Sequence, residues 1–424
     1  MSNNIPYIFI VAPHFPPSSS PPAQRVRLLV KHCASLGFYP VVFTVDSKCR
    51  EEIEDPWMCS LTGDQFQEIR VGCLDFRKTR KFGIGDLGLR MIPSLFSVLK
   101  KEAKKKKPVF ILYPVPPWYI LVIAPLIKGI TAVKYGIDFI DPWVHQEPGK
   151  QKGFKHQLSQ RIARTLEGWV TKNASVIFSV SEGINENLRS RHPKLIGKPM
   201  YAVPYGAEPG DFNEFREKNL IGPEKGHVLI RYIGAIWNDC HPVLDGLMQA
   251  LASVSDDQAI KLEFYGTSYA GEGLAKKQLN NWISRHDMQG YTSEQCLRVT
   301  YKEAVQLTME SDILFLIGGM QPYYAASKLM GLIVSGKPFV AFVHKDSFPA
   351  IFLQKLEYQY LVTYSSETGD LPVDKTEELK HVFMKLIKHK DSFTALNTDH
   401  PLIQENTAAG MTKYFIEKIS LALS

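Results

Sequence analysis

The chain contains 424 residues, of which 45% are hydrophobic and 22% are charged. This length exceeds one compact domain and this composition excludes a disordered chain, so two domains of about 200 residues each are expected. The charge is uneven, because residues 1–205 carry 29 Lys and Arg against 16 Asp and Glu, whereas the remainder carries 21 against 27. The basic first half predicts contact with an anionic partner: a lipid surface, a lipid-phosphate acceptor or a nucleic acid.

Short apolar runs alternate with longer helical patterns throughout the first half. This alternation is typical of βαβ units, in which a parallel sheet carries helices on both faces. The predicted strands are Tyr7–Ala12, Val41–Val45, Val109–Tyr113, Ala132–Asp138, Ser175–Val180 and Tyr201–Pro204. The predicted helices are Arg25–Leu36, Arg90–Lys107, Tyr119–Ile130, His156–Lys172 and Glu182–Arg191.

A second series of the same kind follows Tyr205–Glu224, a stretch rich in Gly, Pro, Asn and Asp that we interpret as a linker. Its predicted strands are Val228–Ile233, Leu262–Tyr265, Ile313–Ile317 and Pro338–Val343. Its predicted helices are Val243–Ala252, Leu274–Arg285, Ser327–Val334 and a long amphipathic one, Pro401–Leu423. We therefore predict a Rossmann-like domain at 1–204, a linker at 205–224, a second Rossmann-like domain at 225–400 and a C-terminal helix at 401–424.

The compartment is inferred from what the sequence lacks. The start of the chain has no basic segment of the kind that opens a signal peptide. Val109 to Ile127 carries no charge over 19 residues, but its four prolines favour a strand, a loop and a short helix over a membrane span. The six cysteines form no CxxC pair and stand at no zinc-ligand spacing. We expect a cytoplasmic protein with free thiols and no metal site.

Ligands of open α/β sheets bind beyond the carboxyl ends of the strands, so the loops there are the candidate sites. After the first strand, a proline-stiffened loop containing Pro17 and Ser18 opens onto the helix of Arg25, where a phosphate or a sugar can bind. The alternative is a surface turn with solvated arginines. Asp138 and Asp141 can hydrogen-bond acceptor hydroxyls or steady positive charge on a sugar. The alternative is that they cap a turn and a helix.

In the second half, the pair Gly318-Gly319 precedes the predicted helix that starts at Ser327. Ser327 can cap this helix while its free N–H groups face a diphosphate, and Lys328 adds a positive charge beside them. An ordinary capped helix with a solvated lysine is the alternative. Arg231 and Gly234 lie at the end of the second series' first strand.

Several segments resemble, in order, the family-4-type glycosyltransferases of bacterial polysaccharide assembly. FPPSSSPPAQR at Phe15–Arg25 resembles the opening of that family, and Tyr113–Pro117 resembles its SxPP loop. Ile137–Trp143 is similar to its DFRDPW segment. Arg231–Trp237 resembles the strand and glycine turn that open the donor-binding half, and Ser327–Pro338 resembles the SKxxEY…GKP signature.

This resemblance implies the GT-B fold: two doubly wound Rossmann-like domains facing across a cleft, with a C-terminal helix that can cross back to the first domain. It implies a retaining, metal-independent glycosyltransferase that needs no cofactor and takes a UDP- or GDP-sugar as substrate. The acceptor would be a glycan or a lipid-linked molecule in cell-surface polysaccharide synthesis. The implied donor-binding residues are Arg231, Gly234, Gly318, Gly319, Ser327 and Lys328. The implied acceptor-side residues are Pro17, Ser18 and Arg25, with Asp141 and Asp138 as catalytic residues.

Three positions depart from the family pattern. Ile140 replaces an Arg, Gly331 replaces the Glu that holds the donor ribose, and Asn238–His241 replaces a basic residue after Gly234. These departures leave open an alternative, a catalytically degenerate glycosyltransferase-like protein that binds or scaffolds other assembly enzymes. A nicotinamide-dependent enzyme is a weaker alternative, because no GxGxxG follows the first strand.

A lysine run, Lys100–Lys107, ends the predicted helix Arg90–Lys107. Apolar residues followed by dense positive charge suit peripheral attachment to an anionic bilayer, such as the inner face of the plasma membrane. A helix that packs on the sheet and has a solvated basic end is the equal alternative. Nucleic acid is not an expected partner, because no aromatic residues interleave with the lysines.

Overall fold

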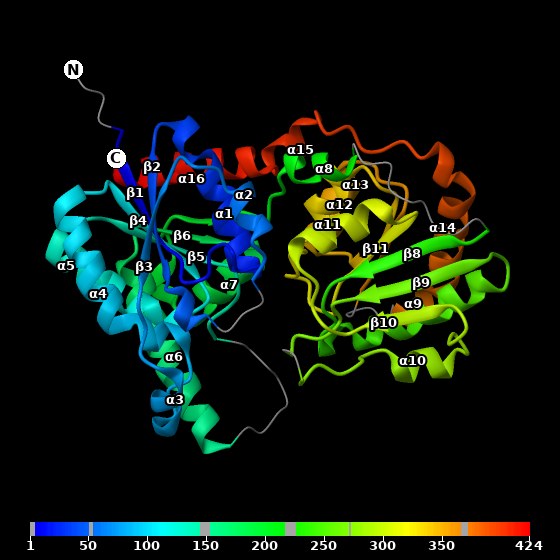
Figure 1. The fold of residues 1–424 in the computed structure, drawn as a ribbon, viewed down its shortest axis with the longest axis horizontal. Coiled ribbons are helices and arrows are strands. Elements are labelled where there is room, and N and C mark those ends of the chain that lie inside the picture. Colours follow the sequence, from blue (N-terminus) through cyan, green and yellow to red (C-terminus); the bar gives the residue numbers. More distant parts are fainter. Residues whose placement is uncertain (1–4, 51–53, 145–152, 217–225, 271–272, 366–371) are drawn as a thin grey trace. The chain divides into compact units, whose positions relative to one another are not determined.

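The computed structural model describes residues 5–50, 54–144, 153–216, 226–270, 273–365 and 372–424 (Figure 1). The chain divides into two compact units. The first unit comprises Met1–Pro204 together with Ala408–Ser424, and the second comprises Tyr205–Thr407. Residues 217–224 of the predicted linker lie outside the described residues, and the earlier part of that segment contains a short helix, α8 (Asn213–Arg216).

The described part of the first unit contains a seven-stranded, fully parallel sheet with the order β3-β2-β1-β4-β5-β6-β7. Most of its inner strands are apolar runs buried on both faces, which is typical of parallel sheets covered by helices. The strands are β1 (Tyr7–Val11), β2 (Tyr39–Val45), β3 (Gln67–Val71), β4 (Phe110–Val115), β5 (Tyr135–Phe139), β6 (Val176–Ser179) and β7 (Met200–Ala202).

Helices cover this sheet, and the last one comes from the far end of the chain. Figure 1 shows α16 running alongside α1, and the core of the unit contains Met411, Phe415 and Ile419 of α16. The helices are α1 (Pro21–Cys33), α2 (Trp57–Leu61), α3 (Phe76–Thr79), α4 (Leu87–Lys106), α5 (Ile123–Thr131), α6 (Phe154–Asn173), α7 (Glu182–Arg191) and α16 (Ala408–Leu423). The predicted continuous helix Pro401–Leu423 was wrong, because the chain breaks between α15 (Pro401–Glu405) and α16.

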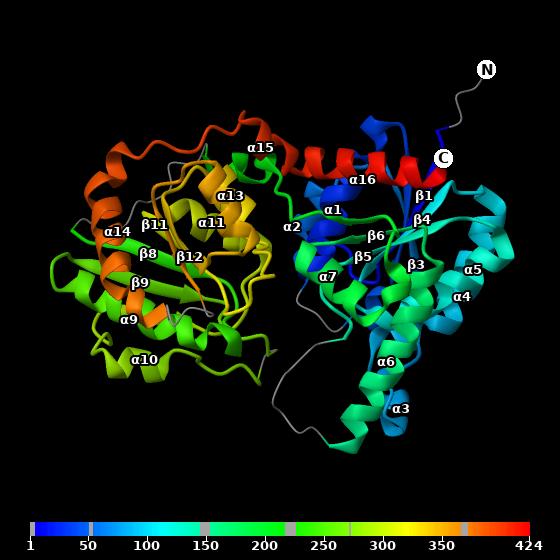
Figure 2. The ribbon, with the colours of Figure 1, turned by 180° about the vertical axis from the view of Figure 1, so that it is seen from behind.

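The described part of the second unit contains a six-stranded parallel sheet with the order β10-β9-β8-β11-β12-β13. Figure 2 shows α14 and α9 on this sheet, and both contribute to its core. The strands are β8 (Val228–Ile233), β9 (Ile260–Tyr265), β10 (Thr292–Gln295), β11 (Ile313–Ile317), β12 (Phe339–His344) and β13 (Leu361–Tyr364). Its helices include α9 (His241–Ser255), α10 (Asn280–Arg285), α11 (Tyr301–Glu310), α12 (Leu329–Ser335), α13 (Phe348–Lys355) and α14 (Thr376–His389).

The lysine-rich helix α4 buries its apolar side. Met91, Leu95 and Leu99 are fully buried, whereas Lys101 and Lys104 near its end are exposed. The apolar residues of α4 therefore pack inside the first unit and leave only the charged end for a partner. Among the described helices, none is both long and apolar enough to cross a membrane.

Candidate functional site

Both sheets contain the strand-order reversal at which doubly wound folds bind ligands. In the second unit it lies between β8 and β11, which are hydrogen-bonded neighbours although the strands β9 and β10 lie between them in the chain. Glycine directly follows each of these strands: Gly234 comes after β8, and Gly318-Gly319 comes after β11. Ligands of such sheets occupy the crevice beyond the carboxyl ends of these two strands. The predicted glycines therefore flank the expected crevice.

Gly234 lies directly against the side chain of Lys328. Its φ is +148°, and a Cβ built there would stand 1.4 Å from Lys328 Nζ and 2.2 Å from Cε. No residue with a side chain can occupy position 234 unless the lysine moves. The structure thus brings together two of the predicted donor-binding residues, Gly234 and Lys328. Because Gly234 has no side chain, the side chain of Lys328 fits directly against its backbone.

The Lys328 ammonium is held by one aromatic residue, Tyr232. Lys328 Nζ lies 3.3 Å from the Tyr232 hydroxyl and 4.3 Å from the centre of its ring. Burial lowers the pKa of Lys328 to about 7, and the positive charge of Arg298 acts in the same direction. Among the residues that the structure describes, no carboxylate lies within salt-bridge distance of this ammonium. The site therefore presents an amine whose protonation would be favoured by an incoming anion.

Gly318 and Gly319 form a tightly packed, buried turn. A Cβ at Gly319 would stand 2.5 Å from Asp239 Oδ2, and one at Gly318 would stand 3.2 Å from the Tyr364 hydroxyl. That hydroxyl donates a hydrogen bond to Gly319 O at 2.8 Å. Loops after β8 and β11 and the end of β13 thus converge, and their backbones approach closely because the two glycines have no side chains.

The prediction that Ser327 caps a helix was wrong. Helix α12 begins at Leu329, its N-cap residue is Lys328, and no side chain caps it. Ser327 lies in the preceding turn and is exposed. Gly331, at the position where the family carries a glutamate, has no heavy atom within 4 Å of a Cβ built on it. A larger side chain therefore has open space at that position.

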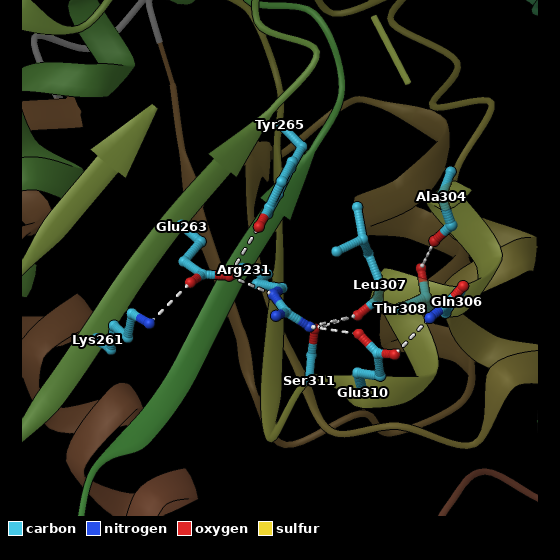
Figure 3. Close-up of polar contacts among 10 residues, drawn as sticks. All are labelled: Arg231, Lys261, Glu263, Tyr265, Ala304, Gln306, Leu307, Thr308, Glu310 and Ser311. Atoms are coloured by element: carbon cyan, nitrogen blue, oxygen red, sulfur yellow. Dashed lines mark hydrogen bonds and ion pairs between the residues drawn. The ribbon is translucent and has the colours of Figure 1, made fainter. Parts of the chain in front are cut away.

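Arg231 lies inside the second unit in a network of its own (Figure 3). It donates to Glu263 Oε2 on β9 at 2.7 Å and to Leu307 O of α11 at 3.2 Å, and Glu310 Oε2 lies 3.7 Å away. Burial would raise the pKa of Glu263, but hydrogen bonds led by the one from Arg231 hold it below its ordinary value. These contacts neutralise the charge of Arg231 and connect β8 to β9 and α11, and its donor-binding role stays a prediction.

In the first unit, the predicted Arg25 and Asp138 meet each other. Arg25 Nε and Nη2 donate to the two carboxylate oxygens of Asp138 at 2.6 and 2.9 Å, and both residues are at most 2% exposed. Arg25 also donates to the carbonyls of Val203 and Pro204, and its guanidinium lies 5.2 Å from the Phe415 ring centre. The Arg25–Asp138 pair therefore connects α1 to β5, and the other contacts of Arg25 connect α1 to Val203–Pro204 and to α16.

This pair differs from what the sequence suggested for its members. Neither the solvated arginine nor the turn-capping carboxylate is observed, and a buried bidentate ion pair takes their place. A residue that is closed off from solvent and fully paired is poorly placed to contact an acceptor. The catalytic role of Asp138 and the acceptor role of Arg25 stay predictions that this geometry disfavours.

The other first-unit candidates lie closer to the surface or in local turns. Asp141 is exposed just beyond β5, and its carbonyl accepts a hydrogen bond from the Trp118 indole at 3.1 Å. Ser18 is only 1% exposed and shares a hydrogen bond with Ser20, while the Pro17 carbonyl accepts one from Asp55 N at 2.6 Å. Of the two predicted catalytic carboxylates, Asp141 is therefore the accessible one.

Two residues near Lys328 escaped the sequence analysis. In the sequence, Tyr232 looks like any apolar residue of a strand. Only Gly234, two residues later, indicates a candidate donor-binding turn. Arg298 follows β10, and its Cα lies 3.5 Å from a Cβ built on Gly266, the residue that follows β9. Recognition of β10 as a strand would have placed Arg298 at the carboxyl edge. In the described parts of the chain, no group of three or more His, Cys, Asp and Glu side chains could hold a metal ion.

Comparison with solved structures defines the class of fold. The chain resembles HepE of Anabaena in complex with UDP-glucose, with a TM-score of 0.60 and 14% identity over 98% of this chain and 100% of that one. It also resembles the apo form of WaaB, a lipopolysaccharide outer core galactosyltransferase, with a TM-score of 0.56 and 12% identity over 98% and 99%. The two units thus form a GT-B fold.

The same fold occurs in a protein with a different named activity. A putative UDP-N-acetylglucosamine 2-epimerase from Listeria monocytogenes matches with a TM-score of 0.54 and 9% identity over 98% of this chain and 95% of that one. No protein-family model matches the chain, and no curated protein does. At these identities the likeness establishes the fold, and the activity has to be argued from the residues.

Proposed function

We propose that the chain is a glycosyltransferase of the family-4 type that transfers a sugar from a UDP- or GDP-sugar to a glycan or lipid-linked acceptor. The observation that carries the proposal is the position of the Lys328 ammonium against Gly234, at the strand-order reversal of the second sheet. Two of the structural neighbours support a sugar nucleotide as the substrate: HepE, which was solved in complex with UDP-glucose, and the galactosyltransferase WaaB.

A donor diphosphate supplies the negative charge that the Lys328 site lacks. Its oxygens would accept hydrogen bonds from the ammonium. Arg298 adds a second positive charge near the lysine, and two cations close together favour an anion between them. As the sugar leaves, negative charge grows on the β-phosphate, and a fixed ammonium stabilises it most at that moment.

The remaining parts of the proposal concern the acceptor and the chemistry. We assign the acceptor to the first unit, near Asp141, and expect retention of the anomeric configuration without a metal ion. Because Asp138 is already paired with Arg25, Asp141 is the carboxylate that can meet an acceptor hydroxyl. We further propose a role in cell-surface polysaccharide synthesis on the cytoplasmic side of a membrane.

Calorimetry with UDP, GDP, ADP, UDP-glucose and GDP-mannose tests the donor site. We expect one nucleoside diphosphate family to bind with micromolar to millimolar affinity, and the base to decide which. Release of free nucleotide from the bound sugar nucleotide, followed over hours with and without a membrane lipid extract, then tests turnover. Silence across the whole panel would overturn the proposal.

A degenerate binding or scaffold protein remains the second candidate, and one observation favours it. Gly331 leaves open the space where the family's glutamate would hold the ribose, so ribose recognition is weakened. Nucleotide binding without sugar release would support this candidate. A Gly331→Glu variant that gains donor affinity but still releases no sugar would strengthen it further.

A further inference from the structure

Helix α6 carries an apolar stripe on the side that faces away from the first unit. Leu158, Ile162 and Trp169 are spaced by four and seven residues, which places them on one face of an α-helix. They are 48%, 47% and 38% exposed. We call these three residues the α6 stripe.

The opposite side of the same helix is the one that packs inside the unit. Ala163, Glu167 and Val170 are buried there, and Glu167 accepts a bidentate pair of hydrogen bonds from Arg191, both at 2.9 Å. The helix therefore already has its core-facing side, and the α6 stripe is an additional apolar surface. Helices of globular proteins normally present charged and polar residues at such positions.

Two more exposed apolar residues lie on the neighbouring helix. Leu126 and Ile130 of α5 are 46% and 43% exposed. Helix α5 contacts α6, and Lys128 Nζ donates to the carbonyl of Asn173, the last residue of α6, at 2.8 Å. Leu126 and Ile130 are each two residues from Lys128, which places them on the opposite side of α5 from the residue that contacts α6, so the α6 stripe is considered by itself. Figure 2 shows both helices in the first unit, with the start of α6 projecting from it.

Exposed positive charge accompanies this surface. Arg161 and Lys172 flank the α6 stripe on the helix, and both are exposed. Within the part of the chain that the structure describes, no carboxylate forms an ion pair with either of them. The acidic residue of α6, Glu167, is buried against Arg191 and offers no negative charge to a partner. Aliphatic residues and a tryptophan beside unneutralised cations match the boundary between acyl chains and anionic headgroups.

We propose that the α6 stripe docks the first unit on an anionic lipid bilayer. The proposal replaces the apolar part of helix α4 as the inserting element, because that part is buried. The exposed lysines of α4 add positive charge to the same unit, and positive charge attracts an anionic bilayer. It extends the proposed function, since a bilayer would bring a lipid-linked acceptor to this unit, and its test does not depend on nucleotide.

Flotation of the full-length protein with vesicles tests the surface. The vesicles contain phosphatidylcholine alone or with about 30% phosphatidylglycerol, a fraction that gives a negative surface potential. We expect binding to the anionic vesicles only. A variant with Leu158, Ile162 and Trp169 changed to Gln should lose about tenfold or more in partitioning. The matched control is Ile351→Gln, a residue of the second unit that is 44% exposed and should leave binding unchanged.

Further measurements distinguish a loss of membrane docking from a loss of folding or of nucleotide binding. Adding vesicles should shift the emission of Trp169 to the blue, and the shift should be absent in Trp169→Phe. An unchanged melting temperature and unchanged nucleotide binding in the triple variant would show that only docking is lost. Wild-type protein that ignores anionic vesicles at low salt would overturn the proposal. So would a triple variant that binds as well as wild type, or sedimentation showing that the stripe joins two copies of the chain.

Discussion

The two units differ in whether a carboxylate neutralises the basic residue predicted to bind a ligand. In the first unit, Arg25 and Asp138 neutralise each other in a buried bidentate pair. In the second unit, Lys328 is held against Gly234 by a tyrosine, and no described carboxylate neutralises it. An ion pair of the first kind holds elements together. A cation of the second kind carries a cost that an anionic ligand can relieve.

This comparison separates charges that are already neutralised from a charge that we propose binds a ligand, which sequence position alone does not do. Arg231 stands on the strand that leads to Gly234, yet Glu263 and Glu310 neutralise it, so it belongs with Arg25 rather than with Lys328. The useful criterion is whether a buried charge already has its counter-charge. The variants described below can break or sharpen this distinction.

The largest effect is expected from Arg25→Met. It leaves the Asp138 carboxylate buried without its partner, and the loss of stability should be about 3–5 kcal/mol. Urea unfolding followed by circular dichroism measures it. The double variant Arg25→Met with Asp138→Leu should recover a large part of the loss, because no uncompensated charge remains.

A catalytic Asp138 would give a different pattern. In that case Asp138→Asn would fold with nearly wild-type stability and lose only the rate of sugar release. This result would break the comparison in the first unit, because the carboxylate would then be more than a partner of Arg25.

Lys328→Met is expected to lower affinity for the bound nucleoside diphosphate by about ten- to a hundredfold, the range for losing a charged hydrogen bond. The melting temperature should not fall, because methionine fills similar space and avoids a buried ammonium. Calorimetry and thermal unfolding of the same preparation check both. Gly234→Ala is the companion variant: its methyl group would displace Lys328, so affinity should fall even though the lysine is present. Unchanged affinity in both variants would remove the donor site from this position.

The sequence predicted the inner parts of this fold well and its edges poorly. Apolar runs such as Ile313–Ile317 and Val228–Ile233 were predicted with their observed bounds, because buried parallel strands are hydrophobic throughout. The missed strands β3, β10 and β13 all lie at an edge of a sheet. Edge strands such as Thr292–Gln295 carry polar residues and leave no apolar signature.

The same limit applies to the candidate site. Glycines after strands and the lysine near a helix start are local signals, so Gly234 and Lys328 could be predicted from the sequence, and their donor-binding role stays a prediction. Their contact with each other, and the pairing of Arg25 with Asp138 across 113 residues, depend on tertiary packing that no local pattern encodes. Arg298 was missed because the strand before it was missed.

The pH dependence of donor affinity gives a smaller, graded test. The pKa of Lys328 is about 7 in the folded protein, so above pH 7 the amine loses its proton, and an anion must bind together with a proton. Affinity for a sugar nucleotide should therefore fall by up to about tenfold per pH unit from pH 7 to 9, and Lys328→Met should show no such slope. Stability of the free protein should move the other way. Unfolded lysine holds its proton in this range and the folded one does not, so wild type gains stability relative to the variant as pH rises.

The smallest effect is expected from Gly331→Ala. Gly331 lies in α12, and a Cβ there meets no heavy atom within 4 Å, so alanine should raise stability by about 0.5–1 kcal/mol through its better helix propensity. Donor affinity should stay unchanged, because a methyl group supplies no hydrogen bond. Thermal unfolding and calorimetry on this variant, run beside Gly331→Glu, separate the helix effect from recognition of the ribose. If alanine alone changed donor affinity, then α12 would move when the nucleotide binds, and Lys328, the N-cap residue of that helix, would move with it.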